Sequence, residues 1–458
     1  MILTLACDKV LIMKYFGTDG FRGRANHELT VELAMKIGQF MAWRFGKDKK
    51  NETVRCVIGK DTRLSSYMIE YAISSGLASA GADAHLMHVT TTPSVAYITR
   101  TEDFDFGIMI TASHNPYHDN GIKIIDEYGY KISEDILVEC EKYMDGEFDI
   151  DFNNIEPGRI VDYLQGRNKY MSYIASSSSE FFRGYRIGLD CANGASHMIA
   201  KTVFDMLGAK TYVINNTPDG KNINVNCGST HIDRLQQFVI DHNLDAGFAF
   251  DGDADRCLAV DEKGKLIDGD GIMYIGAKYL KELGQLKDNK VVVTVMSNLG
   301  LMNAFAENDI STVVTPVGDK YISQELMEHK YGIGGEQSGH IIFNKYSTTG
   351  DGILTAVVMT SIFVEKKCPF SNLTNGLTIM PQKLKNIRTD KKDEIDSDPE
   401  VIAFAEDMNK RLGKGGRVLL RKSGTEPLFR IMVEAKTYED CDRYIEETEE
   451  FIRERYAI

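Results

Sequence analysis

Residues 246–260 read AGFAFDGDADRCLAV, an acidic turn set between two apolar runs. Short runs without polar side chains, bounded by turn residues, are typical of buried β-strands. Carboxylates alternate along the turn, at Asp251, Asp253 and Asp255. At this spacing the side chains can converge on one hard cation, and Mg²⁺ takes a few carboxylates together with water or phosphate. We therefore predict a strand, a magnesium-binding turn and a second strand.

Two alternatives to a magnesium-binding turn exist. In an EF-hand, Glu262 would stand at the twelfth position of the loop, but Arg256 occupies the sixth, where the sharp turn requires Gly. The flanking runs are also typical of strands and not of helices. The other alternative is a solvated acidic turn in which Arg256 is only a charge partner.

An apolar strand, a turn and an amphipathic helix alternate over roughly the first two-thirds of the chain. Residues 54–58 form a β-rich run, and the apolar side chains of residues 68–77 follow helical i, i+3, i+4 spacing. The pattern restarts at residues 185–190 and 291–295. Strands that alternate with helices indicate parallel sheets covered on both faces. We therefore predict three similar α/β units.

The C-terminal part of the chain has a different pattern. Residues 388–400, RTDKKDEIDSDPE, are highly charged and predict a solvated loop or an exposed helix start. Beyond them, apolar runs at residues 418–420 and 429–433 indicate strands, and the last helix has one apolar face. This pattern predicts a small α+β module with one amphipathic helix on a small sheet.

Composition narrows the class of protein. The chain has 458 residues, and at ~100–200 residues per domain this length suggests about three or four domains. A net charge of −14 argues against nonspecific nucleic-acid binding, so phosphate sites must be built locally from Arg, Lys and backbone N–H groups. The eight cysteines include no C-x-x-C pair, which favours a reducing, cytoplasmic compartment over a disulfide framework.

The sequence contains no membrane or export signal. No apolar stretch approaches the ~18 residues that span a bilayer. The first residues, MILTLACDKVLI, have no basic n-region and no small-residue cleavage site. Met13 is an alternative to Met1 as the native start.

A second candidate loop follows another apolar strand. Residues 111–116 read TASHNP and come directly after the run at residues 106–110. In open α/β sheets, ligands bind beyond the carboxyl ends of strands. Pro116 fixes its own φ and keeps Asn115 out of the α region, so the turn is stiff. Ser113 is therefore a candidate nucleophile or phosphoryl carrier; the alternative is a turn-forming Ser that bonds the backbone.

Two further loops carry polar groups among glycines. In residues 334–340, GGEQSGH, glycines permit close approach of a ligand, and Glu336 can accept hydrogen bonds from sugar hydroxyls. The G-x-G-x-x-G spacing of a dinucleotide site is absent, and a flexible turn is the alternative. Residues 421–427, RKSGTEP, together with Arg430 form an anion cradle, because Arg recognises phosphate bidentately. A surface loop with incidental ion pairs is the alternative.

Two weaker signals add cations. Residues 16–23, FGTDGFRG, place Arg22 in a glycine-rich loop, and Lys123 lies shortly after the Ser113 loop. Taken together, an exposed hydroxyl, a hard-metal turn, a sugar-hydroxyl loop and an anion cradle are what phosphoryl transfer on a phosphosugar requires. No GxxxxGK[ST] loop is present, which disfavours a Walker-type nucleotide enzyme.

The sequence resembles the α-D-phosphohexomutase superfamily, nearly end to end from Lys14. The resemblance is carried by the motifs FGTDGFRG, TASHNPYHDNGIKI, DCANGA, GSTH, FDGDADR, VMSNLG, GGEQSGHIIF, TTGDG and RKSGTEPLFRIM. Gln337 in GEQSG, with GSTH and TTGDG, is more similar to the glucosamine-specific branch than to the phosphomannomutase/phosphoglucomutase branch, which usually has Met there.

The resemblance implies four domains around a central cleft: three similar α/β domains and a small C-terminal α+β domain. The expected boundaries are 1–165 with the phosphoserine loop, 166–265 with the metal loop, 266–381 with the sugar-binding loop, and 382–458 with the phosphate-binding loop. Two departures from the family pattern concern these loops. Ala254 replaces a common Gly but carries no ligand group, and Lys422 replaces a common Pro and adds a charge.

The resemblance also implies roles for individual residues. Ser113 would be the phosphoserine and, with Asp251, Asp253 and Asp255, would hold one Mg²⁺. Arg22, Lys123 and His340 would be catalytic residues around the reacting phosphate. The implied substrate-binding residues are Arg256, Gly318, Glu336, Ser338, Arg421, Ser423, Gly424, Thr425 and Arg430.

The implied reaction interconverts glucosamine 6-phosphate and glucosamine 1-phosphate through a 1,6-bisphosphate. It would feed UDP-N-acetylglucosamine and cell-wall precursor synthesis in the cytoplasm, with glucosamine or glucose 1,6-bisphosphate as activator. A priming kinase and a homodimer are possible partners; nucleic acid and membrane are not expected. The alternatives are phosphomannomutase/phosphoglucomutase activity, a metal-dependent phosphatase with Asp251 as nucleophile, and a noncatalytic sugar-phosphate sensor.

Overall fold

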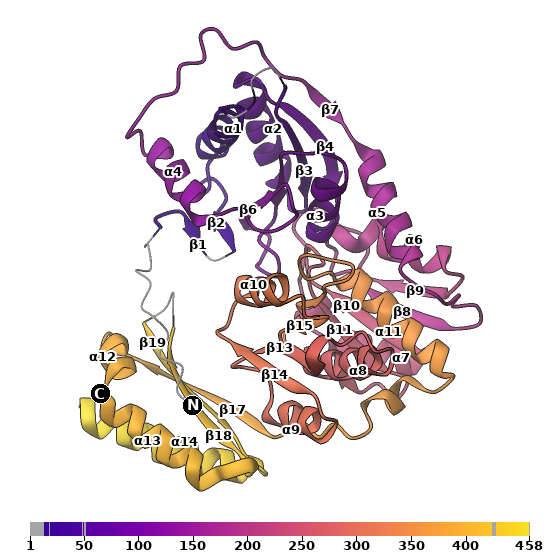
Figure 1. Cartoon of the computed structure of the whole chain (residues 1–458), viewed down its shortest axis with the longest axis vertical. Coiled ribbons are helices and arrows are strands. Elements are labelled where there is room, and N and C mark those ends of the chain that lie inside the picture. The colour runs from indigo at the N-terminus through magenta and orange to yellow at the C-terminus, as the bar shows by residue number, and fades with distance from the viewer. Residues whose placement is uncertain (1–12, 18, 48, 50–51, 424–426, 458) are drawn as a thin grey trace. The chain divides into compact units, whose positions relative to one another are not determined.

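The structure is a computed structural model that describes residues 13–17, 19–47, 49, 52–423 and 427–457. The chain divides into two compact units, Met1–Thr294 with Val314–Leu373 and Val295–Val313 with Thr374–Ile458. Four separate sheets are present among the described residues, and Figure 1 labels their strands. Within the same residues, no helix combines the length and apolar character needed to cross a membrane.

The first sheet has seven strands in the order β1-β2-β6-β5-β3-β4-β7. They are β1 Phe16–Gly17, β2 Gly20–Arg24, β3 Arg55–Lys60, β4 Asp83–Val89, β5 Phe106–Ile110, β6 Asp119–Asp126 and β7 Ile160–Asp162. The helices of this segment are α1 Val31–Gly46, α2 Ser66–Ser79, α3 Thr92–Thr101 and α4 Glu134–Met144. β3 pairs in parallel with β4 and β5, whereas β6 runs antiparallel to β5 and β2.

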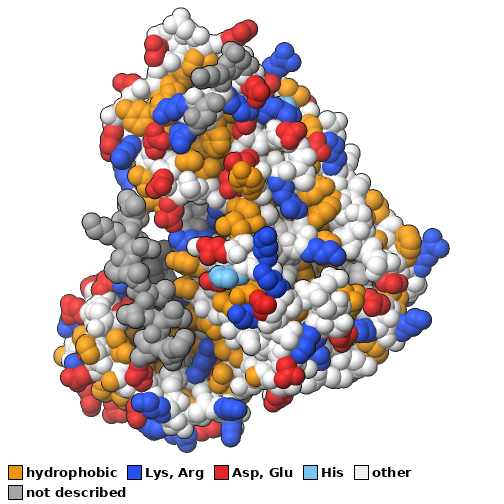
Figure 2. All heavy atoms as spheres, viewed as in Figure 1, with side chains coloured by type: hydrophobic (Ala, Val, Ile, Leu, Met, Phe, Trp, Pro, Cys, Tyr) orange, Lys and Arg blue, Asp and Glu red, His pale blue; other side chains and the backbone are white. Residues whose placement is uncertain are grey.

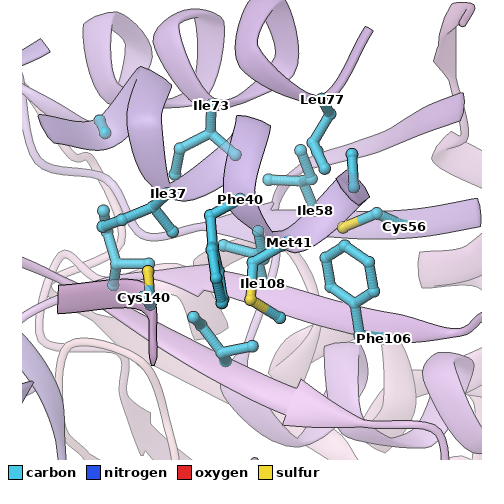
Figure 3. Packing of buried hydrophobic residues seen from close by; sticks show 14 of the residues in the cluster. Ile37, Phe40, Met41, Cys56, Ile58, Ile73, Leu77, Phe106, Ile108 and Cys140 are labelled. Atoms are coloured by element: carbon cyan, nitrogen blue, oxygen red, sulfur yellow. The ribbon is translucent and has the colours of Figure 1, made fainter. Parts of the chain in front are cut away.

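The core of this first segment lies between its helices and its sheet, as Figure 3 shows. Ile37, Phe40 and Met41 of α1 meet the strands β3 and β5 and are fully buried. Helices α1 and α2 can approach closely because Gly76 has no side chain: a Cβ there would lie 2.1 Å from the carbonyl oxygen of Met35. This core fixes the carboxyl ends of β3 and β5, from which the first site loops emerge.

The second sheet has the order β12-β11-β10-β8-β9. Its strands are β8 Arg186–Asp190, β9 Lys210–Ile214, β10 Ala246–Phe250, β11 Cys257–Asp261 and β12 Leu266–Ile267, with helices α5 Leu164–Ser176, α6 Ala200–Met206 and α7 Asp233–Asp241. Every residue of β10 and β11 is buried, as the apolar runs of the sequence predict. The two strands form an antiparallel hairpin that pairs Phe250 with Cys257 and presents the acidic turn at its end.

The third sheet has the order β14-β13-β15-β16. Its strands are β13 Lys290–Thr294, β14 Ser311–Thr315, β15 Ile333–Gly335 and β16 Ile341–Phe343, and the helices of this region are α8 Gly269–Glu282, α10 Asp319–His329 and α11 Gly352–Lys366. β13 and β15 are parallel, and β15 and β16 form an antiparallel hairpin that pairs Gly335 with Ile341. The predicted glycine-rich loop is the turn of that hairpin.

The three predicted α/β units are confirmed, and their sheets, predicted to be parallel, are mixed and contain antiparallel pairs as well. In each unit the strand after a site loop, β6, β11 or β16, runs antiparallel to the strand before it. A parallel partner needs a crossover of about a dozen residues or more. The site loops at 111–118, 251–256 and 336–340 are shorter than that, so the chain has to return as a hairpin.

The second compact unit contains an antiparallel sheet in the order β17-β19-β18. Its elements are α9 Leu299–Glu307, β17 Gln382–Arg388, α12 Lys392–Ser397, α13 Pro399–Leu412, β18 Arg417–Lys422, β19 Leu428–Glu434 and α14 Tyr438–Tyr456. Helix α14 buries Cys441, Ile445 and Ile452 in the core of this unit. The α+β module is thus confirmed, and the charged stretch at 388–400 contains α12 and the start of α13.

Acidic and basic side chains are interspersed over the face drawn in Figure 2. This mixture accompanies a net charge of −14. Any phosphate site must therefore be built from a few specific cations, because a broad electrostatic field of the protein would repel anions.

Candidate active site

Ser113 lies in the loop that follows β5, with its backbone in the left-handed region at a φ of 50°. A residue other than Gly is held there only when its surroundings impose it. The carbonyl oxygen of Ser113 accepts hydrogen bonds from Arg63 Nη2 at 2.8 Å and from Asn224 Nδ2 at 2.9 Å, and its N–H donates to Thr111 Oγ1 at 2.9 Å. The loop therefore presents one fixed hydroxyl.

That hydroxyl points at the acidic turn. Ser113 Oγ donates a hydrogen bond to Asp251 Oδ2 at 2.6 Å, although the two residues are 138 positions apart in sequence. The approach depends on Gly252, because a Cβ at that position would lie 2.4 Å from the carbonyl oxygen of Ser113. The structure thus brings together the two loops that the sequence singles out first.

The three acids of the turn form one compact group. One oxygen from each of Asp251, Asp253 and Asp255 lies within 4.8 Å of the others, and all three residues are buried. Asp253 Oδ1 and Asp255 Oδ1 are buried without a hydrogen-bond partner among the residues that the structure describes. Orphaned carboxylate oxygens of this kind are costly unless a cation binds them, so the group fits Mg²⁺, which prefers such ligands.

The titration of these acids shows how crowded the charges are. Burial, together with repulsion by Asp255 and Asp253, raises the pKa of Asp251 well above its usual range. Burial by itself would also raise the pKa of Asp255. Lys123 and other neighbouring cations outweigh the effect of burial and hold the pKa of that carboxyl below its usual range. A bound divalent cation would relieve the repulsion inside the group.

Lys123 and Arg22 supply positive charge beside the turn. Lys123 extends from β6, and its Nζ lies 3.0 Å from Asp253 Oδ2 and 3.1 Å from Asp255 Oδ2. Arg22, on β2, donates to the carboxylate of Asp19. The structure therefore places Lys123 at the acidic group itself and ties Arg22 to a neighbouring carboxylate.

The remaining predicted residues near the turn are His340 and Arg256. His340 Nε2 accepts from the N–H of Gly350 at 3.1 Å, so Nδ1 carries the ring proton and faces Asp255 Oδ2 at 3.7 Å. The backbone N–H of Arg256 donates to Asp251 Oδ1 at 3.2 Å, and its Nη1 lies 3.2 Å from His114 Nδ1. Burial, followed by the charge of Arg256, lowers the pKa of His114 to about 4, so its ring is neutral and accepts from Arg256.

The glycine-rich hairpin forms a second cluster in the same compact unit. The N–H of Gly318 donates to Glu336 Oε1 at 3.2 Å, and Ser338 Oγ donates to Glu336 Oε2 at 3.4 Å. Gln337 is directed elsewhere: its Nε2 donates at 3.2 Å to Asp268, the residue that caps α8. Glu336, Ser338 and Gly318 thus form one group, while Gln337 holds the hairpin to α8.

The predicted phosphate loop belongs to the second compact unit, whereas the other predicted site residues belong to the first. Arg421 and Arg430 are cross-strand partners on β18 and β19, and Arg430 Nη2 lies 3.4 Å from Ser423 Oγ. Burial and repulsion by Arg430 lower the pKa of Arg421, which is what an anion between them would reverse. Lys422 Nζ instead pairs with Asp393 of α12 at 2.7 Å. Gly424 and Thr425 lie outside the described residues.

Asp61 and Arg63 also support the Ser113 loop, although none of the sequence motifs contains them. Both are fully buried at the end of β3, and Arg63 Nε donates to Asp61 Oδ2 at 2.8 Å. Asp61 also accepts from Thr111 Oγ1 at 2.7 Å, two residues before Ser113. A usable signal was present, since the charged run KDTR directly follows the apolar strand, and ligand sites lie beyond strand carboxyl ends.

Replacing Asp253 by Asn should weaken Mg²⁺ binding by about tenfold or more, because one of three convergent charges is lost. Isothermal titration calorimetry with the purified chain measures this. Glu262→Gln is the matched control, since Glu262 is the acid that an EF-hand would use but instead binds Ser371. A weaker affinity in Glu262→Gln with no change in Asp253→Asn would contradict the assignment of the acidic turn as the metal site.

Four successive segments of the chain match the domains of one known family. Residues 13–149, 162–264 and 268–379 match the phosphoglucomutase/phosphomannomutase alpha/beta/alpha domains I, II and III, and residues 384–451 match the C-terminal domain of the same family. The chain belongs to the phosphoglucomutase/phosphomannomutase family, with its four-domain architecture. The boundaries given from sequence remain predictions.

Two relatives have a more specific name than the family, phosphoglucosamine mutase. A phosphoglucosamine mutase of Lachnospira eligens is 55% identical over 448 residues, covering 97% of this chain and 100% of the relative. The phosphoglucosamine mutase of Bacillus subtilis is 44% identical over 447 residues, covering 97% and 99%.

Two solved structures share the fold. A phosphoglucomutase/phosphomannomutase family protein from Burkholderia thailandensis has a TM-score of 0.80 at 21% identity, covering 96% of this chain and 98% of that one. The N-acetylphosphoglucosamine mutase of Aspergillus fumigatus, solved with GlcNAc-6P and magnesium, has a TM-score of 0.70 at 18% identity, covering 96% of each chain.

Proposed function

We propose that this chain is an isomerase, a phosphoglucosamine mutase, that interconverts glucosamine 6-phosphate and glucosamine 1-phosphate with Ser113 as the phosphoryl carrier. The observation that carries the proposal is the 2.6 Å hydrogen bond from Ser113 Oγ to Asp251 Oδ2 beside two further buried acids. The two relatives named phosphoglucosamine mutase, at 55% and 44% identity over nearly the full chain, support the choice of substrate.

In the proposed reaction, phosphorylated Ser113 is attacked at phosphorus by a hydroxyl oxygen of the sugar. The Ser113 oxygen leaves with the bonding electrons and takes up a proton in place of the one that the sugar hydroxyl loses, which restores the hydroxyl that faces Asp251 at 2.6 Å. Ser113, Asp251, Asp253 and Asp255 would hold one Mg²⁺, which would supply positive charge to the transferring group. Lys123, Arg22 and Arg256 supply the remaining positive charge, and His340, held by Gly350 and facing Asp255, assists proton transfer.

A mutase must also hold the end of the sugar that does not react. Glu336 can accept from vicinal sugar hydroxyls, and Ser338 and Gly318 hold its two oxygens in place. For the second phosphate we propose the anion cradle Arg421, Ser423, Gly424, Thr425 and Arg430. The 1,6-bisphosphate formed by the first transfer would turn round, so that the same cradle holds the new 1-phosphate while the 6-phosphate returns to Ser113.

This cycle has consequences for cofactors and partners. The unphosphorylated chain would be inactive until Ser113 is primed by glucosamine or glucose 1,6-bisphosphate or by a kinase. One Mg²⁺ per chain is expected. We place the activity in cytoplasmic amino-sugar metabolism, upstream of UDP-N-acetylglucosamine and cell-wall precursors, and a homodimer remains a prediction.

A substrate panel tests the choice of sugar. With purified chain, Mg²⁺ and catalytic glucose 1,6-bisphosphate, we expect kcat/KM for glucosamine phosphate to exceed that for mannose and glucose phosphates by about tenfold or more, since a lost polar contact strongly penalises the wrong substrate. Equal or higher values for mannose or glucose phosphates would favour phosphomannomutase/phosphoglucomutase activity. Net phosphate release with an aspartyl adduct would indicate the phosphatase, and binding without turnover would indicate the sensor.

A further inference from the structure

A continuous series of opposite charges runs from helix α10 to the acidic turn. Asp319 Oδ1 lies 2.7 Å from Lys131 Nζ, and the same ammonium group lies 2.8 Å from Asp19 Oδ1. Asp19 Oδ2 in turn lies 3.5 Å from Lys123 Nζ, the cation already described on the acidic turn. The proposed reaction uses Lys123 but gives no role to the other three residues.

Lys131 stands at a junction between two parts of the site. It follows β6, which carries Lys123, while Asp319 opens α10 directly after Gly318, whose N–H binds Glu336. Figure 1 draws α10 close to this end of the first sheet. Lys131 therefore links the sugar-binding hairpin to the transfer centre within one compact unit.

The junction is shielded from bulk water. The side chains of Lys131, Asp19 and Asp319 are 32%, 26% and 18% exposed, and they line a cavity of about 290 Å³ that also reaches Lys123 and His340. Partly buried charges are screened by salt much less than surface charges. The balance of charge along this series can therefore control where each flexible ammonium group rests.

Three cations converge on the carboxylate of Asp19. Its carboxylate accepts from Arg22, from Lys131 and, at the longer distance of 3.5 Å, from Lys123. Lys123 is at the same time 3.0 Å and 3.1 Å from two acids of the turn. If Asp19 lost Lys131, only Arg22 and Lys123 would remain to balance its charge, and its pull on Lys123 away from the turn would grow, because charges attract more strongly in a partly buried setting.

We propose that Lys131 is a positioning residue: by neutralising Asp19, it keeps the ammonium group of Lys123 on Asp253 and Asp255. Asp319 holds Lys131 in turn, so the orientation of Lys123 depends on the start of α10 beside the sugar-binding hairpin. The inference deepens the proposed function, and its forecast for turnover rests on that function. It makes two separate forecasts, one for turnover and one for metal binding.

The test compares Lys131→Met with Lys320→Met. Lys320 is the matched control because it neighbours Asp319, is equally exposed at 32%, and also joins α10 to the first segment, through Glu134 of α4 at 2.8 Å. Its partner has no contact with Asp19 among the ion pairs of the described residues. Both variants are measured as full-length chains, with thermal melting to confirm folding.

For Lys131→Met we expect kcat to fall about tenfold or more with KM changed less than about twofold, because Lys123 acts in the transition state and not in sugar binding. Mg²⁺ should bind about three- to tenfold more tightly by calorimetry, since Lys123 no longer competes for Asp253 and Asp255. Lys320→Met should leave both quantities within about twofold of the parent chain. Lys131→Arg, which keeps the charge, should recover most of kcat.

Three outcomes would overturn the inference: Lys131→Met behaving like Lys320→Met, weaker Mg²⁺ binding in Lys131→Met, or a loss confined to KM. If Lys131→Met does not fold, Lys131→Gln carries the same forecasts. If the parent chain turns over no hexose phosphate, the proposed function fails, but the Mg²⁺ titration still decides the role of Lys131.

Discussion

Replacing Ser113 by Ala is expected to abolish mutase turnover, by at least about 10⁴-fold, because the chain loses the only oxygen proposed to carry the phosphoryl group. The fold should survive. The hydroxyl of Ser113 makes a 2.6 Å hydrogen bond to Asp251, and losing one such bond costs about 1 kcal/mol. Turnover is measured with glucosamine phosphate, Mg²⁺ and catalytic bisphosphate, and folding by urea denaturation.

The matched control for Ser113→Ala is Ser196→Ala. Ser196 is also fully buried, and its hydroxyl donates to the carbonyl oxygen of Cys191 at 3.3 Å and not to an acid of the turn. It should lose comparable stability and keep its activity. Mass spectrometry after incubation with bisphosphate should locate one phosphate on Ser113 in the parent chain. Full turnover in Ser113→Ala, or phosphate found on Asp251, would exclude the mutase mechanism.

Much of the local structure follows from short apolar runs. The run at residues 106–110 coincides with β5, Phe106–Ile110, and every residue in it is buried. Such a strand has one stable environment, a sheet interior, so its position is readable without knowing its partners. The direction of a strand cannot be predicted from its apolar run. It depends on the length of each site loop, which forces β6, β11 and β16 to return antiparallel.

The candidate site was partly predictable for a related reason. Ser113 and the acidic turn each lie just beyond a strand, so their presence at a sheet edge followed from sequence. Their proximity was implied only by the family resemblance and not by the local pattern, because it requires two different sheets to meet and depends on the missing side chain of Gly252. Gln337 served in the sequence only as a mark of the family branch, and the structure shows that its amide is bound to Asp268.

The sequence places Arg63 just beyond a strand, but it does not show that the guanidinium is completely buried, and the importance of Arg63 lies in that burial. An isolated Arg between polar residues normally predicts an exposed side chain. Here its guanidinium donates to Asp61 Oδ2 at 2.8 Å, to the carbonyl oxygen of Ser113 at 2.8 Å and to that of Asp119 at 3.1 Å, and also to the carbonyl of Pro116. One planar group thus ties the end of β3 to both ends of the phosphoryl-carrier loop.

Replacing Arg63 by Met should therefore lower the free energy of unfolding by about 3–5 kcal/mol, the cost of breaking a buried ion pair from one side. Asp61 would keep only neutral donors, Thr111, Ser66 and a backbone N–H. Turnover should fall as well, since the left-handed conformation of Ser113 loses one of the two donors to its carbonyl oxygen. Urea denaturation gives the stability change.

The control for Arg63→Met is Arg55→Met at the start of β3, where the guanidinium is more exposed and Nη1 donates to the carbonyl oxygen of Asp103 at 3.3 Å. We expect that variant to lose less than about 1 kcal/mol. Adding Asp61→Asn to Arg63→Met should restore part of the lost stability, because the uncompensated buried charge is then removed. If Arg63→Met instead matches Arg55→Met, the guanidinium of Arg63 does not hold the loop, and the geometry of Ser113 must be maintained by Asn224 and Thr111 alone.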